Sequence, residues 1–104
     1  MSQGPVRVLS PEGCFPFSKK RNGTVLGEGA GALVLESLEH AQARGATILA
    51  ELTGVGMSSD SKDMVNPDID GPRSAMEMAL ADAGLKPEDI DYLNAHGTAT
   101  ALND

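Results

Sequence analysis

The sequence predicts an α/β fold in which helices pack on a parallel or mixed β-sheet. Apolar runs that suit strands alternate with helical patterns, in the order strand, helix, strand, helix, strand. The chain has 104 residues, 40% of them hydrophobic, which is enough for one small domain with a core. Three strands leave sheet edges exposed, so we expect the pattern to belong to a larger fold.

The first half of the chain predicts one strand and one helix after an irregular start over residues 1–22. The apolar run 31–37 suits a strand that is buried on both faces. Ser37 can cap a helix over residues 38–44, and Gly45 can end it.

The second half predicts a strand over 47–58, a helix and a last strand. Gly54 and Gly56 indicate a bend or a close backbone approach within the first of these strands. A polar loop over 58–70 then leads to Pro72, which fits the first turn of a helix. The apolar residues of this helix recur at helical spacing, and Gly84 ends the run: Ala75, Met76, Ala79, Leu80 and Ala83.

One helical turn over 87–89 and a strand over 90–95 complete the pattern, and His96 follows that strand directly. Ligand sites in open α/β sheets lie beyond the carboxyl ends of strands. We therefore expect His96 to lie at a site.

The charge of the chain limits its partners. A formal net charge of −7 argues against nucleic acid and against an anionic membrane surface, because both require a basic face. One cysteine excludes an internal disulfide and fits a reducing compartment. No apolar run reaches the length of a membrane span, and the N-terminus lacks a signal pattern. The expected location is cytoplasmic.

The stretch GEGAGA, residues 27–32, has the spacing of a dinucleotide-binding fingerprint. That fingerprint needs a strand before it and a helix after it, whereas a strand-like run follows here. We prefer a structural role for Gly27, Gly29 and Gly31, in which the backbone passes close to another segment or adopts a positive φ.

Two further kinds of site are disfavoured. Cys14 is the only thiol, and its neighbours supply neither a base nor a helix N-terminus that would favour a thiolate. A metal site needs three or four ligands, but the only histidines are His40 and His96. We expect no metal and no catalytic role for Cys14.

The stretch HGTAT, residues 96–100, is the strongest candidate for chemistry. His96 can exchange a proton near neutral pH, and Gly97 allows a backbone or ligand to come close. In extended chain the Thr98 and Thr100 hydroxyls face one side, where they could hydrogen-bond a ligand amide. The alternative is a histidine satisfied by a neighbouring carbonyl at a strand end.

Two long stretches, PFSKKRNGTVLGEGAGALVLESLEHAQARGA and DAGLKPEDIDYLNAHGTATALND, closely resemble the 3-oxoacyl-[acyl-carrier-protein] synthases, or β-ketoacyl synthases. The resemblance extends from about Arg7 to Asp104, and RVLSPEG and GVGMSSD are similar to the nodulation-type branch. It implies a partial thiolase-like fold over residues 1–104, from the end of the N-terminal half to the start of the C-terminal half. It also implies decarboxylative Claisen condensation of acyl thioesters with malonyl carrier protein, without a bound cofactor.

The resemblance assigns roles to residues of HGTAT. His96 matches one of two histidines that stabilise the enolate oxygen, and Thr98 and Thr100 match threonines that bind the phosphopantetheine arm of the carrier protein. Gly27, Gly29 and Gly31 match a glycine-rich turn, and Cys14 matches a structural cysteine. The nucleophilic cysteine and the second histidine have no counterpart in this chain, so we expect no activity from it alone.

Three functions follow as hypotheses. The chain is an inactive part of a condensing enzyme, a piece that completes another chain through its strand edges, or a module that binds carrier protein. Carrier proteins are acidic, so the third requires a cluster among the basic residues Lys19, Lys20, Arg21, Arg44 and Lys62. The sequence is compatible both with a homodimer and with a complex that includes complementing synthase segments.

Overall fold

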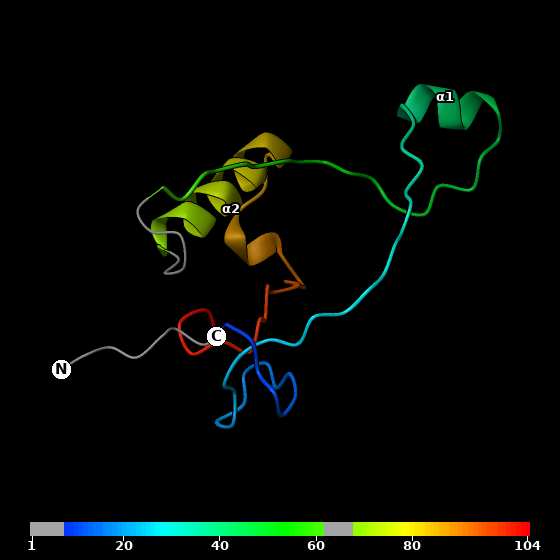
Figure 1. Ribbon diagram of the computed structural model, residues 1–104. Helices are drawn as coiled ribbons and strands as arrows, with labels where there is room; N and C mark the ends of the chain where they lie inside the picture. The colour runs from blue at the N-terminus through cyan, green and yellow to red at the C-terminus, as the bar shows by residue number, and fades with distance from the viewer. Residues whose placement is uncertain (1–7, 62–67) are drawn as a thin grey trace.

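Two helices and one 3-10 turn form the regular structure of the computed structural model, which describes residues 8–61 and 68–104. Helix α1 spans Leu38–Ala43, helix α2 spans Asp70–Ala83, and the turn η1 spans Pro87–Asp89. In Figure 1, α1 stands apart from α2 at one end of an elongated chain. The predicted loop over 58–70 lies partly outside the described residues.

Helix α1 forms where its local signals predict it. The Ser37 hydroxyl accepts a hydrogen bond from the His40 N–H at 3.3 Å, which satisfies a donor of the first turn. Gly45 follows the helix with a left-handed φ of 67°. The predicted cap and stop are both confirmed.

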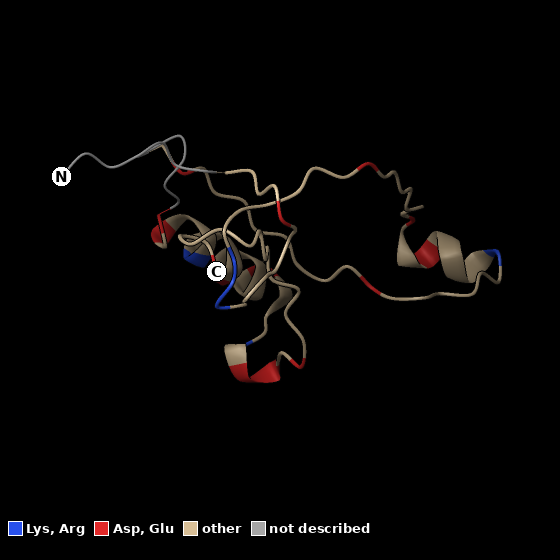
Figure 2. Ribbon diagram, turned by 60° about the horizontal axis from the view of Figure 1, so that its bottom comes forward, with Lys and Arg blue, Asp and Glu red and all other residues tan. Residues whose placement is uncertain are grey.

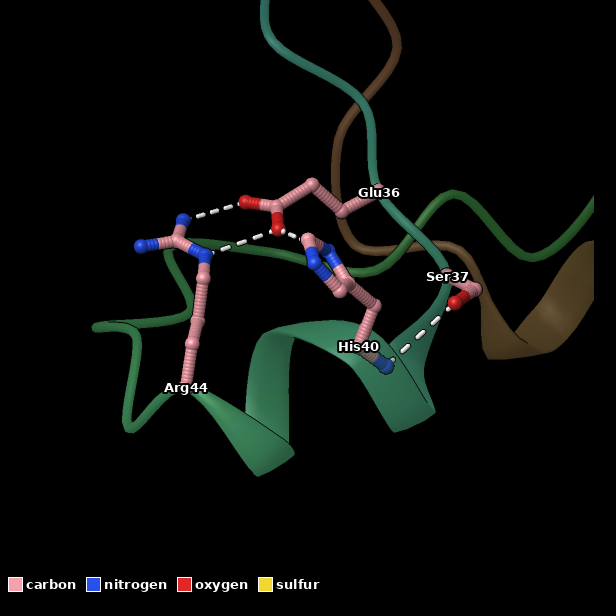
Figure 3. A network of polar contacts seen from close by, with 4 residues as sticks. All are labelled: Glu36, Ser37, His40 and Arg44. Carbon is pink, nitrogen blue, oxygen red and sulfur yellow. Dashed lines mark hydrogen bonds and ion pairs between the residues drawn. The ribbon is translucent and has the colours of Figure 1, made fainter.

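A polar network braces this short helix (Figure 3). The Glu36 carboxylate accepts hydrogen bonds from Nε of Arg44 at 2.8 Å and from Nη2 of the same side chain. Nδ1 of His40 lies 2.7 Å from Oε2 of Glu36. Six residues are too few for a stable isolated helix, so these contacts and the Ser37 cap help to hold α1.

Helix α2 and η1 also confirm the sequence prediction. Pro72 lies in the first turn of α2, where its missing N–H is tolerated. Gly84 ends the helix at φ 67°, and its N–H bonds to carbonyls of the last turn. In η1, the Asp89 carboxylate accepts the Lys86 N–H at 2.9 Å.

The predicted mixed sheet does not form within the described residues. The segments 31–37, 47–58 and 90–95 carry no strand pairing there, and the one bridge is an isolated parallel pair between Leu9 and Thr24. A strand is stable only when a neighbouring strand satisfies its N–H and C=O groups, and the described part of this chain supplies no such neighbour to these segments. The described residues therefore do not confirm the mixed sheet that the sequence predicts.

The segment around Gly54 and Gly56 lies directly against α2, as Figure 1 shows for the chain that runs beside this helix. A Cβ at Gly56 would lie 1.9 Å from the Ala75 carbonyl oxygen, and one at Gly54 would lie 2.3 Å from that of Ala79. The Val55 N–H donates to Oδ2 of Asp82 on α2 at 2.9 Å. The predicted close backbone approach is confirmed.

Little of the apolar surface is buried. Among the described residues, Ala41 and Ala99 are the only buried hydrophobic side chains. Leu33, Val34 and Leu49 are 90%, 87% and 95% exposed. The radius of gyration is 18.3 Å, against about 13 Å for a compact domain of about 100 residues. The extended segments therefore present apolar side chains that the described chain does not cover.

Candidate functional site

The candidate site is the loop 96–104, which lies against a second loop formed by residues 13–24. Ala99, in the first of these loops, is fully buried and has a positive φ of 60°. Its N–H donates to Oδ2 of Asp104 at 3.0 Å, and its carbonyl accepts the Gly23 N–H at 2.8 Å. Both backbone groups of this buried residue are thus satisfied.

Asp104 joins the two loops. The same Oδ2 atom that accepts the Ala99 N–H also accepts the Phe17 N–H at 2.9 Å. Burial raises the pKa of the Asp104 carboxyl, but hydrogen bonds from the Phe17 backbone, the Asn103 side chain and the Ala99 and Thr98 backbones lower it, and the net pKa lies below 3.8. The carboxylate is charged at neutral pH, which strengthens the hydrogen bonds it accepts.

Thr98 and Thr100 are brought together as the sequence predicts, but by a different backbone. Their Oγ1 atoms lie 2.9 Å apart, and both residues are partly buried. The expected geometry was extended chain, whereas the structure places the left-handed Ala99 between them. The turn at Ala99, and not strand alternation, pairs the two hydroxyls.

His96 and Gly97 lie at the start of this loop. The His96 side chain is exposed and has no hydrogen-bond partner within the described part of the chain. Gly97 has a φ of 53°, and a Cβ there would lie 3.3 Å from the Phe17 ring. The close neighbour expected at Gly97 is therefore the aromatic ring of Phe17. The His96 side chain is available to bind a ligand.

The three glycines of the GEGAGA stretch and Cys14 are the other residues that the sequence analysis considers. A Cβ at Gly27, Gly29 or Gly31 would meet no atom within 4 Å, and none of the three has a positive φ. The close approach expected for these glycines is not made by the described residues. Cys14 is exposed in the 13–24 loop.

The five basic residues predicted to contact a carrier protein lie in different parts of the chain. Lys19, Lys20 and Arg21 are consecutive in the 13–24 loop, whereas Arg44 follows α1, and Figures 1 and 2 show this loop far from α1. Lys62 lies outside the described residues. Lys19, Lys20 and Arg21 thus lie together, and Arg44 lies apart from them.

The described ranges hold neither a cluster of metal ligands nor a membrane-spanning helix. No three His, Cys, Asp or Glu side chains lie together as metal ligands there. None of the helices in those ranges has the length and apolar character of a membrane span.

The sequence alone did not identify three residues of the site: Phe17, Gly23 and Asp104. Phe17 and Asp104 are 87 positions apart, so no local pattern links them. Gly23 follows Asn22 in an Asn-Gly pair, a turn signal that could have been noticed. Its φ is 140°, and a Cβ there would lie 2.9 Å from the Leu9 carbonyl carbon.

Known protein families match most of the chain. Residues 2–41 match the N-terminal domain of β-ketoacyl synthases, and residues 49–104 match their C-terminal domain. Nodulation protein E of Rhizobium leguminosarum bv. trifolii is 63% identical over 99 residues, which are 95% of this chain and 25% of that protein. The 3-oxoacyl-[acyl-carrier-protein] synthase 2 of Staphylococcus aureus is 52% identical over 88% of this chain and 23% of its own length.

Solved structures agree with these relatives. The ishigamide ketosynthase/chain length factor matches with a TM-score of 0.88 and 50% identity, over 93% of this chain and 24% of its own. A type II polyketide ketosynthase in complex with its acyl-carrier protein matches with a TM-score of 0.82 and 43% identity, over 88% and 23%. The chain spans about a quarter of the length of the relatives it matches.

Proposed function

Because the chain belongs to the β-ketoacyl synthase family, we propose that it supplies part of the condensation site of such an enzyme. The reaction is carbon–carbon bond formation between an acyl thioester and malonyl carrier protein, in fatty acid, polyketide or nodulation-factor synthesis. The observation that carries this proposal is the loop 96–104, which leaves His96 exposed beside the paired hydroxyls of Thr98 and Thr100.

His96 acts as a hydrogen-bond donor in this proposal. When malonyl thioester loses carbon dioxide, negative charge develops on the thioester oxygen of the resulting enolate. A donor already aimed at that oxygen stabilises the charge without reorganisation. The imidazole of His96 is not engaged by another described residue, so one ring nitrogen can serve as this donor.

Thr98 and Thr100 bind the pantetheine arm that carries the malonyl group. One hydroxyl donates to the other at 2.9 Å, which leaves a donor and lone pairs for the amide groups of the arm. The arm arrives on an acyl carrier protein, and one structural neighbour is a ketosynthase in complex with such a protein. Carrier-protein binding by this chain alone is the alternative function, and the consecutive basic residues Lys19, Lys20 and Arg21 are its candidate contact.

The chain is completed by other synthase segments. Apolar side chains of its extended segments, such as Leu33, Val34 and Leu49, are almost fully exposed. Extended segments with unpaired backbone groups can each add a strand to a sheet. Gly27, Gly29 and Gly31 enter one of these segments, and we assign them to contacts with the completing segments. The thiolase-like mixed sheet then forms across the junction of the N- and C-terminal halves.

A graft tests this function. In the grafted synthase, this chain replaces the matching segment of nodulation protein E from Rhizobium leguminosarum bv. trifolii, its 63% identical relative. We expect 3-oxoacyl product from the grafted synthase, detected by mass spectrometry of the carrier protein, and none from the isolated chain. His96→Ala should lower kcat by about 100- to 1,000-fold, which is the usual effect of removing one oxyanion donor.

His40→Ala is the matched control, because His40 is the other histidine and is exposed on α1. It should leave kcat within about twofold, as expected for a surface substitution. Equal losses in both histidine variants, or product from the purified isolated chain, would reject the proposal.

A further inference from the structure

We propose that Asp104 is a positioning residue, whose carboxylate clamps the loop 96–104 onto the loop 13–24 and so keeps the Thr98 and Thr100 hydroxyls paired. The carboxylate clamp consists of Asp104 and the two N–H groups that its Oδ2 accepts, from Phe17 and Ala99. The importance of the pairing for catalysis rests on the proposed function, whereas the clamp itself does not.

The clamp holds two residues in an unfavourable backbone conformation. Phe17 and Ala99 each have a φ of 60°, and they are the only non-glycine residues with positive φ in the described part of the chain. Side chains other than glycine disfavour this region, so such residues persist only when their surroundings fix them. One carboxylate oxygen accepts the N–H of both, at 2.9 and 3.0 Å.

The left-handed backbone at Ala99 determines how close the side chains of its two neighbours lie. Thr98 and Thr100 flank it, and their Oγ1 atoms lie 2.9 Å apart across the left-handed turn at Ala99. If Ala99 returned to extended backbone, the two threonine side chains would still share one face, but residues two apart in extended chain are separated by roughly 6.5 Å, so the hydroxyls would no longer meet. Loss of the clamp therefore separates the hydroxyls without changing either threonine.

The Asp104 side chain is itself held in place. Its Oδ1 accepts a hydrogen bond from Nδ2 of Asn103 at 3.1 Å, and its backbone N–H donates to the Thr100 carbonyl at 3.3 Å. Asp104 thus forms hydrogen bonds with both Ala99 and Thr100 in the turn that it stabilises. The Gly23 N–H holds the Ala99 carbonyl from the other loop at 2.8 Å.

Substitution in the grafted synthase tests the clamp. Asp104→Ala removes both acceptor interactions, and Asp104→Asn keeps the shape but loses the charge. We expect Asp104→Ala to raise KM for malonyl carrier protein about tenfold, with a smaller change in kcat, and Asp104→Asn to lie between it and the parent. If Asp104 only stabilised the fold, its substitution would lower the fraction of enzyme that is active, and thus kcat. KM would then stay unchanged.

Asp82→Asn is the matched control. The Asp82 carboxylate also accepts a backbone N–H from a distant segment, that of Val55 at 2.9 Å, but it lies on α2. It should leave KM for malonyl carrier protein unchanged. An equal rise in KM in the Asp82 and Asp104 variants would overturn the positioning role.

Hydrogen exchange gives a readout that does not require activity. In Asp104→Ala, peptides covering 15–19 and 97–101 should exchange at least about tenfold faster, because the Phe17 and Ala99 amides lose their acceptor. Peptides over 54–57 should not change. If the parent graft is inactive, the proposed function fails and exchange alone decides on the clamp. Unchanged exchange at 15–19 and 97–101 refutes the clamp, whatever the activity.

Discussion

Glycine is required at Gly54 and Gly56 because the backbone there touches α2. The contacts fall on Ala75, Ala79 and Ala83, small residues at helical spacing. The pair of glycines indicated a close approach from the sequence alone, but not which element they approach. By contrast, the site residues Phe17 and Asp104 gave no sequence signal, because their contact spans most of the chain.

Gly56→Ala should separate this segment from α2. The added Cβ would lie 1.9 Å from the Ala75 carbonyl oxygen and 2.7 Å from the Ala79 nitrogen, so the backbone must shift. We expect the free energy of unfolding of the grafted synthase to fall by about 1–3 kcal/mol, a typical overpacking cost. Urea denaturation measures this change.

The control for that substitution is Gly71→Ala in α2. The nearest atom to a Cβ there is 3.5 Å away, which is an ordinary contact. The free energy of unfolding should stay the same or rise by up to about 1 kcal/mol, because alanine favours a helix more than glycine does. If Gly56→Ala were as harmless as Gly71→Ala, the close approach to α2 would not exist in solution.

The structure confirms the helices that the sequence predicts, but the described residues do not confirm the predicted sheet. Ser37, Gly45, Pro72 and Gly84 are local signals that act within one turn, and the structure uses all of them. A sheet depends on partners distant in sequence, and the described residues offer none to the three expected strands. The alternation of elements therefore predicted where the chain is extended, but not what pairs with it.

Helix α1 should depend on pH through Glu36. The hydrogen bond from Arg44 lowers the pKa of the Glu36 carboxyl, burial opposes this, and the contact with His40 adds to the lowering, so the folded pKa lies below 4.5. The contribution of Glu36 to α1 is fully present above pH 4.5 and is lost as pH falls through the folded pKa. NMR titration of the Glu36 carboxyl carbon in the grafted synthase measures this midpoint.

Arg44→Gln is the control for Glu36, because it removes the guanidinium that causes most of the lowering. The Glu36 midpoint should then rise toward 4.5. A midpoint that is the same with and without Arg44 would show that the bridge in Figure 3 does not form in solution.

At the scale of the whole molecule, the chain has the conformation of a ketosynthase segment but not the interior of a domain. It superposes on a ketosynthase with a TM-score of 0.88, yet within the described residues it buries only Ala41 and Ala99 among its hydrophobic side chains. Burial of apolar surface is the main favourable term in folding. Composition alone predicted a core for 104 residues; it could not show that the apolar side chains face outward.

Calorimetry of the isolated chain, and of the chain co-expressed with the flanking segments of nodulation protein E, tests the central claim most directly. The account predicts no cooperative unfolding transition for the isolated chain, because so little apolar surface is buried, and a single sharp transition for the co-purified assembly. A cooperative transition of the isolated chain at monomer mass, unchanged by the flanking segments, would mean that the chain folds as an independent domain and is not completed by other synthase segments.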